Sequence, residues 1–206
     1  MSYTTQIDAA KKGIFTKQMA DVLKEEKHIN KEWLMERVAN GRIAIPANKN
    51  HINLIGKGVG DGLLTKVNVN LGVSEACNNM EMEIDKVRNA INLKADAIMD
   101  LSIFGDTRAF RRRLVEESPV MLGTVPMYDA VAKLGKNIKD MSVDDLFRVT
   151  EEHMVDGIDF LTIHAGLNRT CVERVQKNPR LTHIVSRGGS ILYEWMLKND
   201  KENPFY

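Results

Sequence analysis

Five short apolar runs, each ending at a polar or glycine-rich junction and followed by a helix-like pattern, constrain the fold of this 206-residue chain most strongly. The runs and their junctions occupy residues 66–70, 97–102, 121–128, 160–166 and 184–189. Helices are predicted at about 80–94, 106–117, 142–156, 168–177 and 190–199. Parallel strands that alternate with helices direct their C-terminal ends to the same side. The sequence therefore predicts an α/β fold whose junctions share one rim, where such folds bind ligands.

The first 62 residues have a different pattern from the rest of the chain. They predict three helices, over 4–12, 16–26 and 31–40, and then a loop rich in Asn, Gly and Lys at 47–62. Asn30 is the expected N-cap of the third helix, and Gly41 is expected in the left-handed conformation after it. We therefore expect a helical N-terminal region and loop at 1–62 and a (β/α) part at 63–206.

The (β/α) part is too short for a closed barrel. A (β/α)8 barrel needs eight units in about 250 residues, whereas about five are predicted here. The Gly-x-Gly-x-x-Gly motif that often follows the first strand of a doubly wound sheet is absent after Asn70. The sheet is therefore either open or part of a barrel cut short. Ser142 and Asp145 resemble a capping box that opens one of the later helices.

The composition of the chain indicates which kinds of molecule it binds. Lys and Arg number 29 against 28 Asp and Glu, so the formal net charge is +1 at pH 7 and favours neither nucleic acid nor a membrane surface. No apolar run approaches the roughly 20 residues of a membrane span, and the N-terminus lacks a signal-peptide pattern. Cys77 and Cys171 are too few for a disulfide framework and lack Cys-x-x-Cys spacing. We expect a cytoplasmic protein that binds a small molecule.

The sharpest local signal is Ser-Arg-Gly-Gly-Ser at residues 186–190. A strand that turns here into a helix would present backbone N–H groups, a hydroxyl and the Arg187 guanidinium to one point, as a phosphate monoester requires. The alternative is an ordinary glycine-bearing turn with a solvated arginine. His164 ends another apolar run, where it could bind a substrate oxygen or act as an acid or base, or serve only a structural role.

Other polar side chains mark the ends of the predicted strands. Asn68 and Asn70 lie two apart, so both face the same side of the first strand, as ligand-facing or merely strand-ending amides. Tyr128 follows Pro126, which could open a helix and leave the phenol at the rim; packing in the core is the alternative. Asp100 and Ser102 end the second strand, where a carboxylate could bind a ligand or a metal.

Two further sets of residues are predicted to lie in solvent. A basic cluster shares its helix with Glu116 and Glu117, which indicates a solvated face with local ion pairs rather than a nucleic-acid patch. Its members are Arg108, Arg111, Arg112 and Arg113. The remaining histidines lack a position at a strand end and are interpreted as surface or loop residues: His28, His51, His153 and His183.

Seven strings along nearly the whole chain resemble the phosphomethylpyrimidine synthase family when they are taken together and in order. They are IPANKNH (45–51), KVNVNLG (66–72), IMDLS (98–102), GTVPMY (123–128), TIHAG (162–166), IVSRGGS (184–190) and ENPFY (202–206). The resemblance implies a radical S-adenosylmethionine (SAM) lyase on a (β/α)8 barrel, which cleaves SAM with a [4Fe-4S] cluster and rearranges 5-aminoimidazole ribotide.

The resemblance also implies which residues hold the ribotide and what the chain lacks. The matching positions are Asn70, Met99, Tyr128, His164, Ser186, Arg187 and Gly188. Family members are about twice as long, and their later half carries two histidines for a divalent metal (zinc) and a C-terminal cluster motif, neither of which this chain matches. We therefore expect a truncated or cleaved N-terminal portion, inactive alone, with no metal ligands of its own. Its open sheet edges should pair with a second copy, as a homodimer, or with the missing half.

Two branches of the family make different products from the ribotide. One makes the hydroxymethylpyrimidine phosphate of thiamine, and the other makes 5-hydroxybenzimidazole for the lower ligand of some cobamides. After Ser102 this chain reads Ile103-Phe104-Gly where the thiamine branch usually reads Thr-Gly-Gly. This departure resembles the hydroxybenzimidazole branch, so we expect 5-hydroxybenzimidazole as the product, with the thiamine pyrimidine as the alternative. Two other classes stay open: a non-catalytic ribotide-binding module, and a barrel enzyme with aldol-type chemistry, for which Lys66 lies at the wrong end of its strand.

Overall fold

A four-stranded parallel sheet organises the chain in the computed structural model, which describes residues 2–134 and 137–206. Its strands follow chain order across the sheet: β3 (Asn68–Leu71), β4 (Ala97–Asp100), β5 (Met121–Thr124) and β6 (Phe160–Leu161). Helices connect them: α4 (Met80–Asn92), α5 (Thr107–Glu117), α6 (Pro126–Leu134) and α7 (Val143–Val155). The predicted α/β class is confirmed, and parallel strands in sequential order with helical crossovers are the arrangement of a partial barrel.

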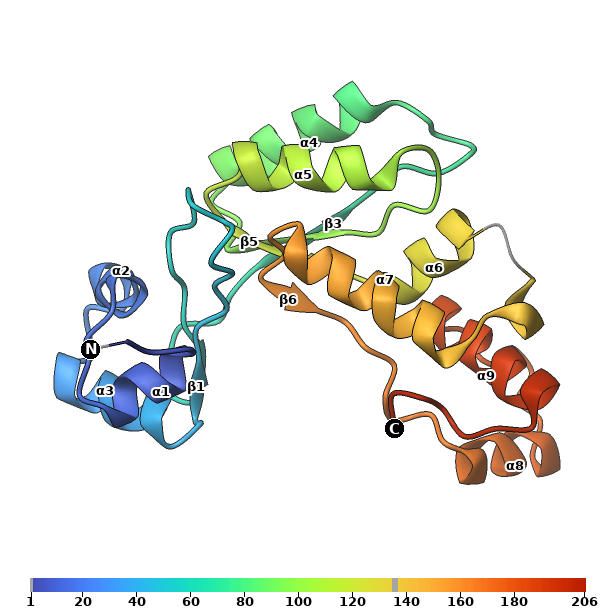
Figure 1. The fold of residues 1–206 in the computed structure, drawn as a ribbon. Helices are drawn as coiled ribbons and strands as arrows, with labels where there is room; N and C mark the ends of the chain where they lie inside the picture. The colour runs from blue at the N-terminus through green and yellow to red at the C-terminus, as the bar shows by residue number, and fades with distance from the viewer. Residues whose placement is uncertain (1, 135–136) are drawn as a thin grey trace.

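One face of the sheet carries the main core. Helices α4 and α5 lie next to each other over it (Figure 1). The strand residues on this face include Leu71, Ile98 and Leu122, which contact Ile84 of α4 and Leu114 of α5. Side chains alternate between the faces of a strand, so the residues in between belong to the opposite face. The strand register aligns Asn70, Met99 and Gly123 there.

The loop before β3 covers the opposite face of the sheet at the N-terminal ends of β4 and β5. Leu54 of this loop is buried against Ala97 and Met121 of the sheet. Gly123 and Phe160 are register partners on adjacent strands, and a Cβ atom on Gly123 would lie 2.3 Å from the Phe160 ring. Glycine at this position therefore lets the aromatic ring lie across the sheet.

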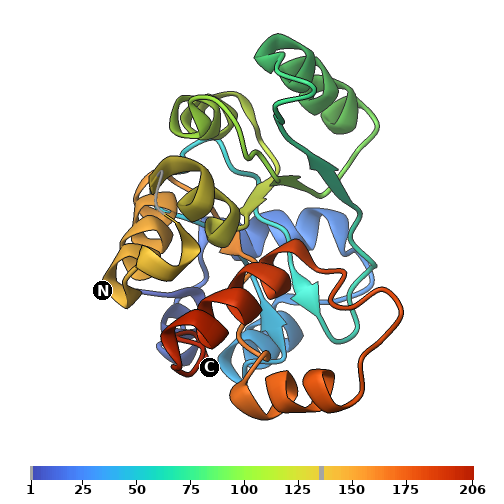
Figure 2. The same ribbon diagram turned by 90° about the vertical axis from the view of Figure 1, so that its right-hand side faces the viewer.

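The C-terminal part builds a second core beside the sheet. It joins α6 and α7 to η1 (Ile138–Asp140), α8 (Arg169–Lys177) and α9 (Arg187–Asn199), with Leu192 and Trp195 of α9 almost fully buried. Figure 2 shows α8 at the opposite end of the molecule from α4. The Ser142 and Asp145 capping box is confirmed at the start of α7, and α6 begins at Pro126 as predicted.

The N-terminal residues form their own small core at one end of the molecule (Figure 1). It contains α1 (Gln6–Lys11), α2 (Lys17–Glu25), α3 (Lys31–Ala39) and the antiparallel pair β1 (Ile43–Ala44) and β2 (Val59–Gly60). The Asn30 side chain accepts a hydrogen bond from the Trp33 amide, and Gly41 has a φ of 69°, so both predicted helix signals are confirmed. The division of the chain after residue 62 stays a prediction.

The fifth predicted strand, at residues 184–189, is wrong. Ile184 and Val185 belong to no strand, and the Val185 side chain is 76% exposed. Among the described residues no strand lies beyond β6, so this segment has no neighbour with which to form ladder hydrogen bonds. Helix α9 also begins at Arg187, earlier than the predicted residue 190, because the Ser186 hydroxyl caps it. None of the described helices is long and apolar enough to cross a membrane.

Candidate functional site

Three of the predicted junctions meet where α6, the segment after β6 and the start of α9 come together. The ring centroids of Tyr128 and His164 are 6.4 Å apart. The Arg187 guanidinium carbon lies 5.7 Å from the centre of the Tyr128 ring. An aromatic ring, an imidazole and a cation from segments far apart in sequence therefore share one small region.

The close approach of His164 to α9 depends on Gly188. A Cβ atom at this position would lie 2.1 Å from His164 Cε1 and 2.5 Å from Nδ1, inside van der Waals contact. The Ser186 hydroxyl accepts a hydrogen bond from the Gly189 amide at 3.2 Å and caps the helix. Both Ser186 and Arg187 are exposed, so the positive end of the α9 dipole, a hydroxyl and a guanidinium face solvent beside the imidazole.

Burial favours the neutral form of His164 and leaves one ring nitrogen unsatisfied. Burial lowers the pKa of His164, because desolvation disfavours the imidazolium. Its Nδ1 atom is buried and finds no hydrogen-bond partner within the described part of the chain. A neutral imidazole offers one donor and one acceptor nitrogen, so this ring can hydrogen-bond a polar ligand atom.

Two hollows flank this cluster. One, of about 280 Å³, is lined by Tyr128 and Arg187 together with Ile103, Val131, Ala132 and Ile191. The other, of about 380 Å³, lies on the side of His164 and Ser186 and also contains Gly189 and Cys171 in its wall. The cluster therefore borders two hollows, and both walls are more apolar than polar.

Asn70 and Met99 lie on neighbouring strands of the sheet. They are register partners on β3 and β4 and share the face opposite the main core. Asn68 Nδ2 donates to Asn70 Oδ1 at 2.8 Å and so orients the Asn70 amide. Met99 and Tyr128 both pack against the second core, and the Met99 sulfur accepts a hydrogen bond from Thr162 at 3.9 Å. The structure thus brings Tyr128, His164, Ser186, Arg187 and Gly188 together, whereas Asn70 is placed only as the strand neighbour of Met99.

The sequence profile of the radical SAM ThiC family matches residues 5–206. The chain belongs to this family. It is 58% identical over all 206 residues to the phosphomethylpyrimidine synthases of Clostridium tetani and Clostridium perfringens, covering 45% and 47% of those proteins. The synthase of Alkaliphilus metalliredigens is 56% identical over the same 206 residues, and the chain covers 47% of that protein. The chain therefore spans slightly less than half the length of these relatives.

Radical SAM enzymes use a [4Fe-4S] cluster and SAM, but the described residues of this ThiC family chain do not fit a metal group. Across residues 2–134 and 137–206, no three His, Cys, Asp or Glu side chains gather in a way that could hold a metal ion. Cys77 lies in an exposed turn before α4 and Cys171 in α8, so the two thiols come from separate elements.

Asn203 braces the His164 segment of this ThiC family fold, and the sequence analysis missed it as a site residue. Its Nδ2 donates to the carbonyl oxygens of His164 and Leu167, both at 2.8 Å, and its Oδ1 accepts from the Phe205 amide. The side chain is buried, so these contacts are shielded from water. The family-like string at 202–206 contains Asn203 and could have indicated it, but only the fold shows that this segment contacts His164.

Asp100 is not at the ligand-facing rim, so that expectation is wrong. Side-chain alternation places it with Leu71 and Thr124 on the face that the helices cover, whereas Met99 faces the other way. Burial raises the pKa of Asp100 to about 6, against the opposing effect of a hydrogen bond that its carboxylate accepts from the Ser102 amide. Ser102 is buried too, and its hydroxyl accepts from the Val73 amide.

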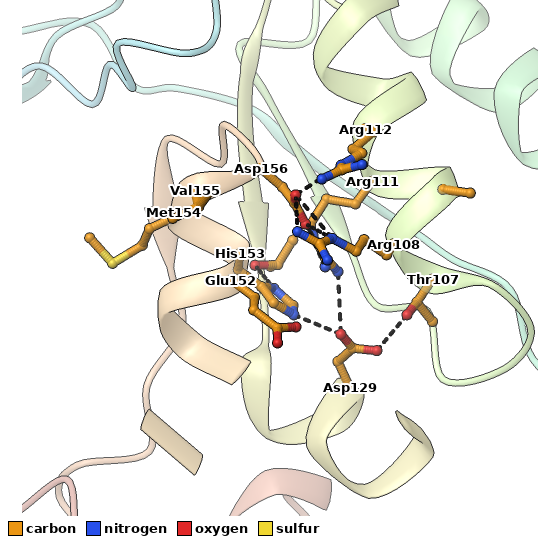
Figure 3. A network of polar contacts seen from close by, with 12 residues as sticks. Thr107, Arg108, Arg111, Arg112, Asp129, Glu152, His153, Met154, Val155 and Asp156 are labelled. Carbon is orange, nitrogen blue, oxygen red and sulfur yellow. Dashed lines mark hydrogen bonds and ion pairs between the residues drawn. The ribbon is translucent and has the colours of Figure 1, made fainter. Parts of the chain in front are cut away.

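The basic cluster is only partly a solvated face. Arg113 pairs with Glu117 and Glu81 at the surface, as the prediction required. Arg111 is instead 1% exposed, and its guanidinium contacts Asp156 at 2.9 Å and Asp129 at 3.3 Å (Figure 3). Arg108 and Arg112 also donate to the buried Asp156 carboxylate. The prediction failed for Arg111 because its acidic partners lie on α6 and after α7, far away in sequence.

Two of the histidines predicted to lie at the surface are buried. His153 Nε2 hydrogen-bonds Asp129 at 2.9 Å and its Nδ1 bonds the Thr124 hydroxyl at 2.8 Å, so the neutral ring satisfies both partners. His51 places Nδ1 2.7 Å from the Asp159 carboxylate and Nε2 2.7 Å from the Ser118 carbonyl oxygen. Carbonyl and carboxylate oxygens only accept, so His51 satisfies both contacts as an imidazolium. His28 and His183 are exposed, as predicted.

Proposed function

We propose that this chain supplies the ribotide-binding part of a radical SAM lyase that rearranges 5-aminoimidazole ribotide. The observation that carries the proposal is the meeting of Tyr128, His164 and the Ser186–Gly188 turn at one place on the rim. The family match and the relatives' name, phosphomethylpyrimidine synthase, support chemistry on a phosphorylated small molecule.

The phosphate of the ribotide would bind at the start of α9. Free backbone N–H groups and the helix dipole favour an anion there, and Ser186 and Arg187 add a hydroxyl and a charge-assisted hydrogen bond. Binding energy from this remote group helps to hold the reacting ring in a productive orientation. The phosphate contacts therefore act as an anchor for the rest of the ligand.

The imidazole and ribose would lie between the anchor and the sheet. The Tyr128 ring offers a flat apolar surface, and the neutral His164 ring offers a hydrogen bond through a nitrogen that is otherwise unsatisfied. Asn70, oriented by Asn68, supplies an amide from the sheet side. These groups bind and orient the substrate and exclude water; when SAM and the cluster are bound in the complete enzyme, those cofactors supply the radical chemistry.

The proposed product of the complete enzyme is the phosphomethylpyrimidine for which its relatives are named. A second candidate product is 5-hydroxybenzimidazole, which the sequence after Ser102 favours. One observation supports this candidate: Ile103 lines the hollow beside Tyr128 and Arg187, so the departure from the thiamine-branch string lies next to the proposed ligand. Mass spectrometry of the product formed from the ribotide and SAM by the full-length enzyme distinguishes the two.

Replacing the phosphate anchor tests the binding proposal. In the full-length protein we expect Arg187→Ala to weaken ribotide binding about ten- to a hundredfold, as for loss of a charge-assisted phosphate contact. Arg180, an exposed arginine in the loop before the turn, provides the matched control, and Arg180→Ala should leave binding within about twofold. Isothermal titration calorimetry measures both. An unchanged dissociation constant in Arg187→Ala removes this residue from the site.

The alternative of a non-catalytic ribotide-binding module makes a different prediction. A module would bind ribotide in calorimetry, but the full-length protein reconstituted with iron and sulfide would not cleave SAM reductively. Cleavage to 5′-deoxyadenosine supports the lyase. Pairing of the sheet edges β3 and β6 with a second copy or with further chain also remains a proposal, which sedimentation as a stable monomer of this chain alone would contradict.

A further inference from the structure

Asp129 directly follows Tyr128 on α6, but its side chain points into a different part of the protein. Consecutive residues on a helix are about 100° apart around its axis. Tyr128 faces His164 and Arg187, whereas Asp129 faces α5 and α7 (Figure 3). One turn of helix therefore connects the candidate site to a buried polar network.

Three donors from two other helices converge on the Asp129 carboxylate. The Thr107 hydroxyl, at the start of α5, donates to Oδ1 at 2.5 Å. Arg111 Nη1 and His153 Nε2 donate to Oδ2 at 3.3 and 2.9 Å. The carboxylate is 2% exposed, so these contacts are largely shielded from solvent. Burial would raise the pKa of Asp129, but the hydrogen bonds from His153 and Thr107 outweigh it and lower the pKa to about 2.

The network also reaches the sheet next to the candidate site. His153 accepts a hydrogen bond at Nδ1 from the Thr124 hydroxyl, at the C-terminal end of β5. Only Val125 separates this residue from Pro126, where α6 begins. The carboxylate of Asp129 is thus tied to the strand before its own helix and to the helices on either side, which restrains rotation of the first turn of α6 about its axis.

We infer that Asp129 is a positioning residue that holds the first turn of α6 in the rotation that places Tyr128 against His164 and Arg187. The expected effect of Asp129 on ligand binding rests on the proposed ribotide site. Its expected effect on the position of the Tyr128 ring is independent of that proposal. A merely structural role for the network is the alternative, in which any loss of a buried carboxylate would have the same consequences.

Asp156 provides the matched control. It is a second buried carboxylate on the same Arg111 guanidinium, at 2.9 Å, but it follows α7 and accepts hydrogen bonds from arginines of α5. Asp156→Asn therefore disturbs the network through Arg111 but changes no side chain of α6. If the network acts only through stability, Asp129→Asn and Asp156→Asn should be equivalent at the candidate site.

The experiment uses the full-length protein labelled with fluorotyrosine and observed by ¹⁹F NMR. Tyr128→Phe assigns the Tyr128 resonance. We expect Asp129→Asn to shift or broaden this resonance and to weaken binding of 5-aminoimidazole ribotide about tenfold, because a displaced contact group costs binding and orientation. Asp156→Asn leaves all three donors of the Asp129 carboxylate in place, so it should leave the resonance in place and the dissociation constant within about twofold. Thr107→Val, which removes a single donor, should act in the same direction as Asp129→Asn but more weakly, and it serves if Asp129→Asn does not fold.

The outcomes separate the two proposals. An unmoved Tyr128 resonance in Asp129→Asn, or in Thr107→Val if only that variant folds, overturns the inference. So do equal effects of the Asp129 and Asp156 substitutions on resonance and binding. If the unsubstituted protein does not bind the ribotide but the Tyr128 resonance still moves only in the Asp129 and Thr107 variants, the ribotide proposal fails and the positioning role of Asp129 stands.

Discussion

Gly188→Ala should separate ligand binding from folding, because it adds a methyl group where the His164 ring now lies. The new Cβ would be 2.1 Å from Cε1 and 2.6 Å from Nε2, whereas ordinary van der Waals contacts of such atoms lie at 3.4–4 Å. The ring must therefore move by roughly 1 Å or more. The backbone cannot follow freely, because Asn203 holds the His164 carbonyl oxygen at 2.8 Å. The displacement must be taken up by the imidazole.

The expected cost falls on binding rather than on stability. A misplacement of about 1 Å can cost up to about a hundredfold, so we expect ribotide affinity to fall ten- to a hundredfold. Alanine also favours the helix by about 1 kcal/mol over glycine, which offsets part of the strain in α9. Calorimetry measures the affinity, and thermal unfolding measures the stability, which should change little.

Gly189→Ala is the matched control one position along the same helix. Its Cβ would meet Ile184 and the Ser186 side chain at 3.3 Å, a tight contact that small shifts relieve without moving His164. We expect its affinity to stay within about threefold of the unsubstituted protein. Equal affinities for the two alanine variants, or an unchanged affinity in Gly188→Ala, would refute the role assigned to the close packing of His164.

Two other contacts make testable predictions. Burial alone would lower the pKa of His51, but the Asp159 carboxylate and the Ser118 carbonyl raise it. The stability that the imidazolium contributes should therefore be complete below about pH 6.5 and lost as the pH rises through the raised pKa of the folded state. Denaturant unfolding across this pH range measures whether the free energy of unfolding falls with pH, and His51→Gln should remove this pH dependence. A free energy of unfolding that rises with pH only in the unsubstituted protein would contradict the prediction. Asn203→Ala leaves buried carbonyl groups unpaired and should cost about 1–3 kcal/mol, with faster amide hydrogen exchange around His164; unchanged exchange there would show that the brace is not needed.

Local signals in the sequence predicted most of the fold. The caps at Asn30 and Ser142 and the helix start at Pro126 depend on hydrogen bonds and torsions within a few residues, and all three are confirmed. Four of the five predicted strands formed, because apolar runs separated by amphipathic helices need no distant information to be recognised. The order of the strands also follows from the short connections and right-handed crossovers of such units.

The candidate site was partly predictable for the same reason. Parallel strand ends meet on one rim, so Tyr128, His164 and the turn at Ser186 could be placed together before any coordinates were known. Asn203 could not be placed there, because its contact with His164 spans 39 residues and its neighbours in the sequence do not indicate that contact. The fifth strand failed for a related reason, since a strand needs a neighbour and residues 184–189 have none in the described fold.

The sequence by itself determined several helix caps, four of the five predicted strands, and which family the chain resembles. Only the tertiary structure decided the environment of the charged groups. Arg111 and Asp156 lie 45 residues apart, and His51 and Asp159 lie 108 apart, so neither pair is visible in a local pattern. Burial of a charge is set by partners that the fold brings from elsewhere, whereas capping and periodicity are set by neighbours along the chain.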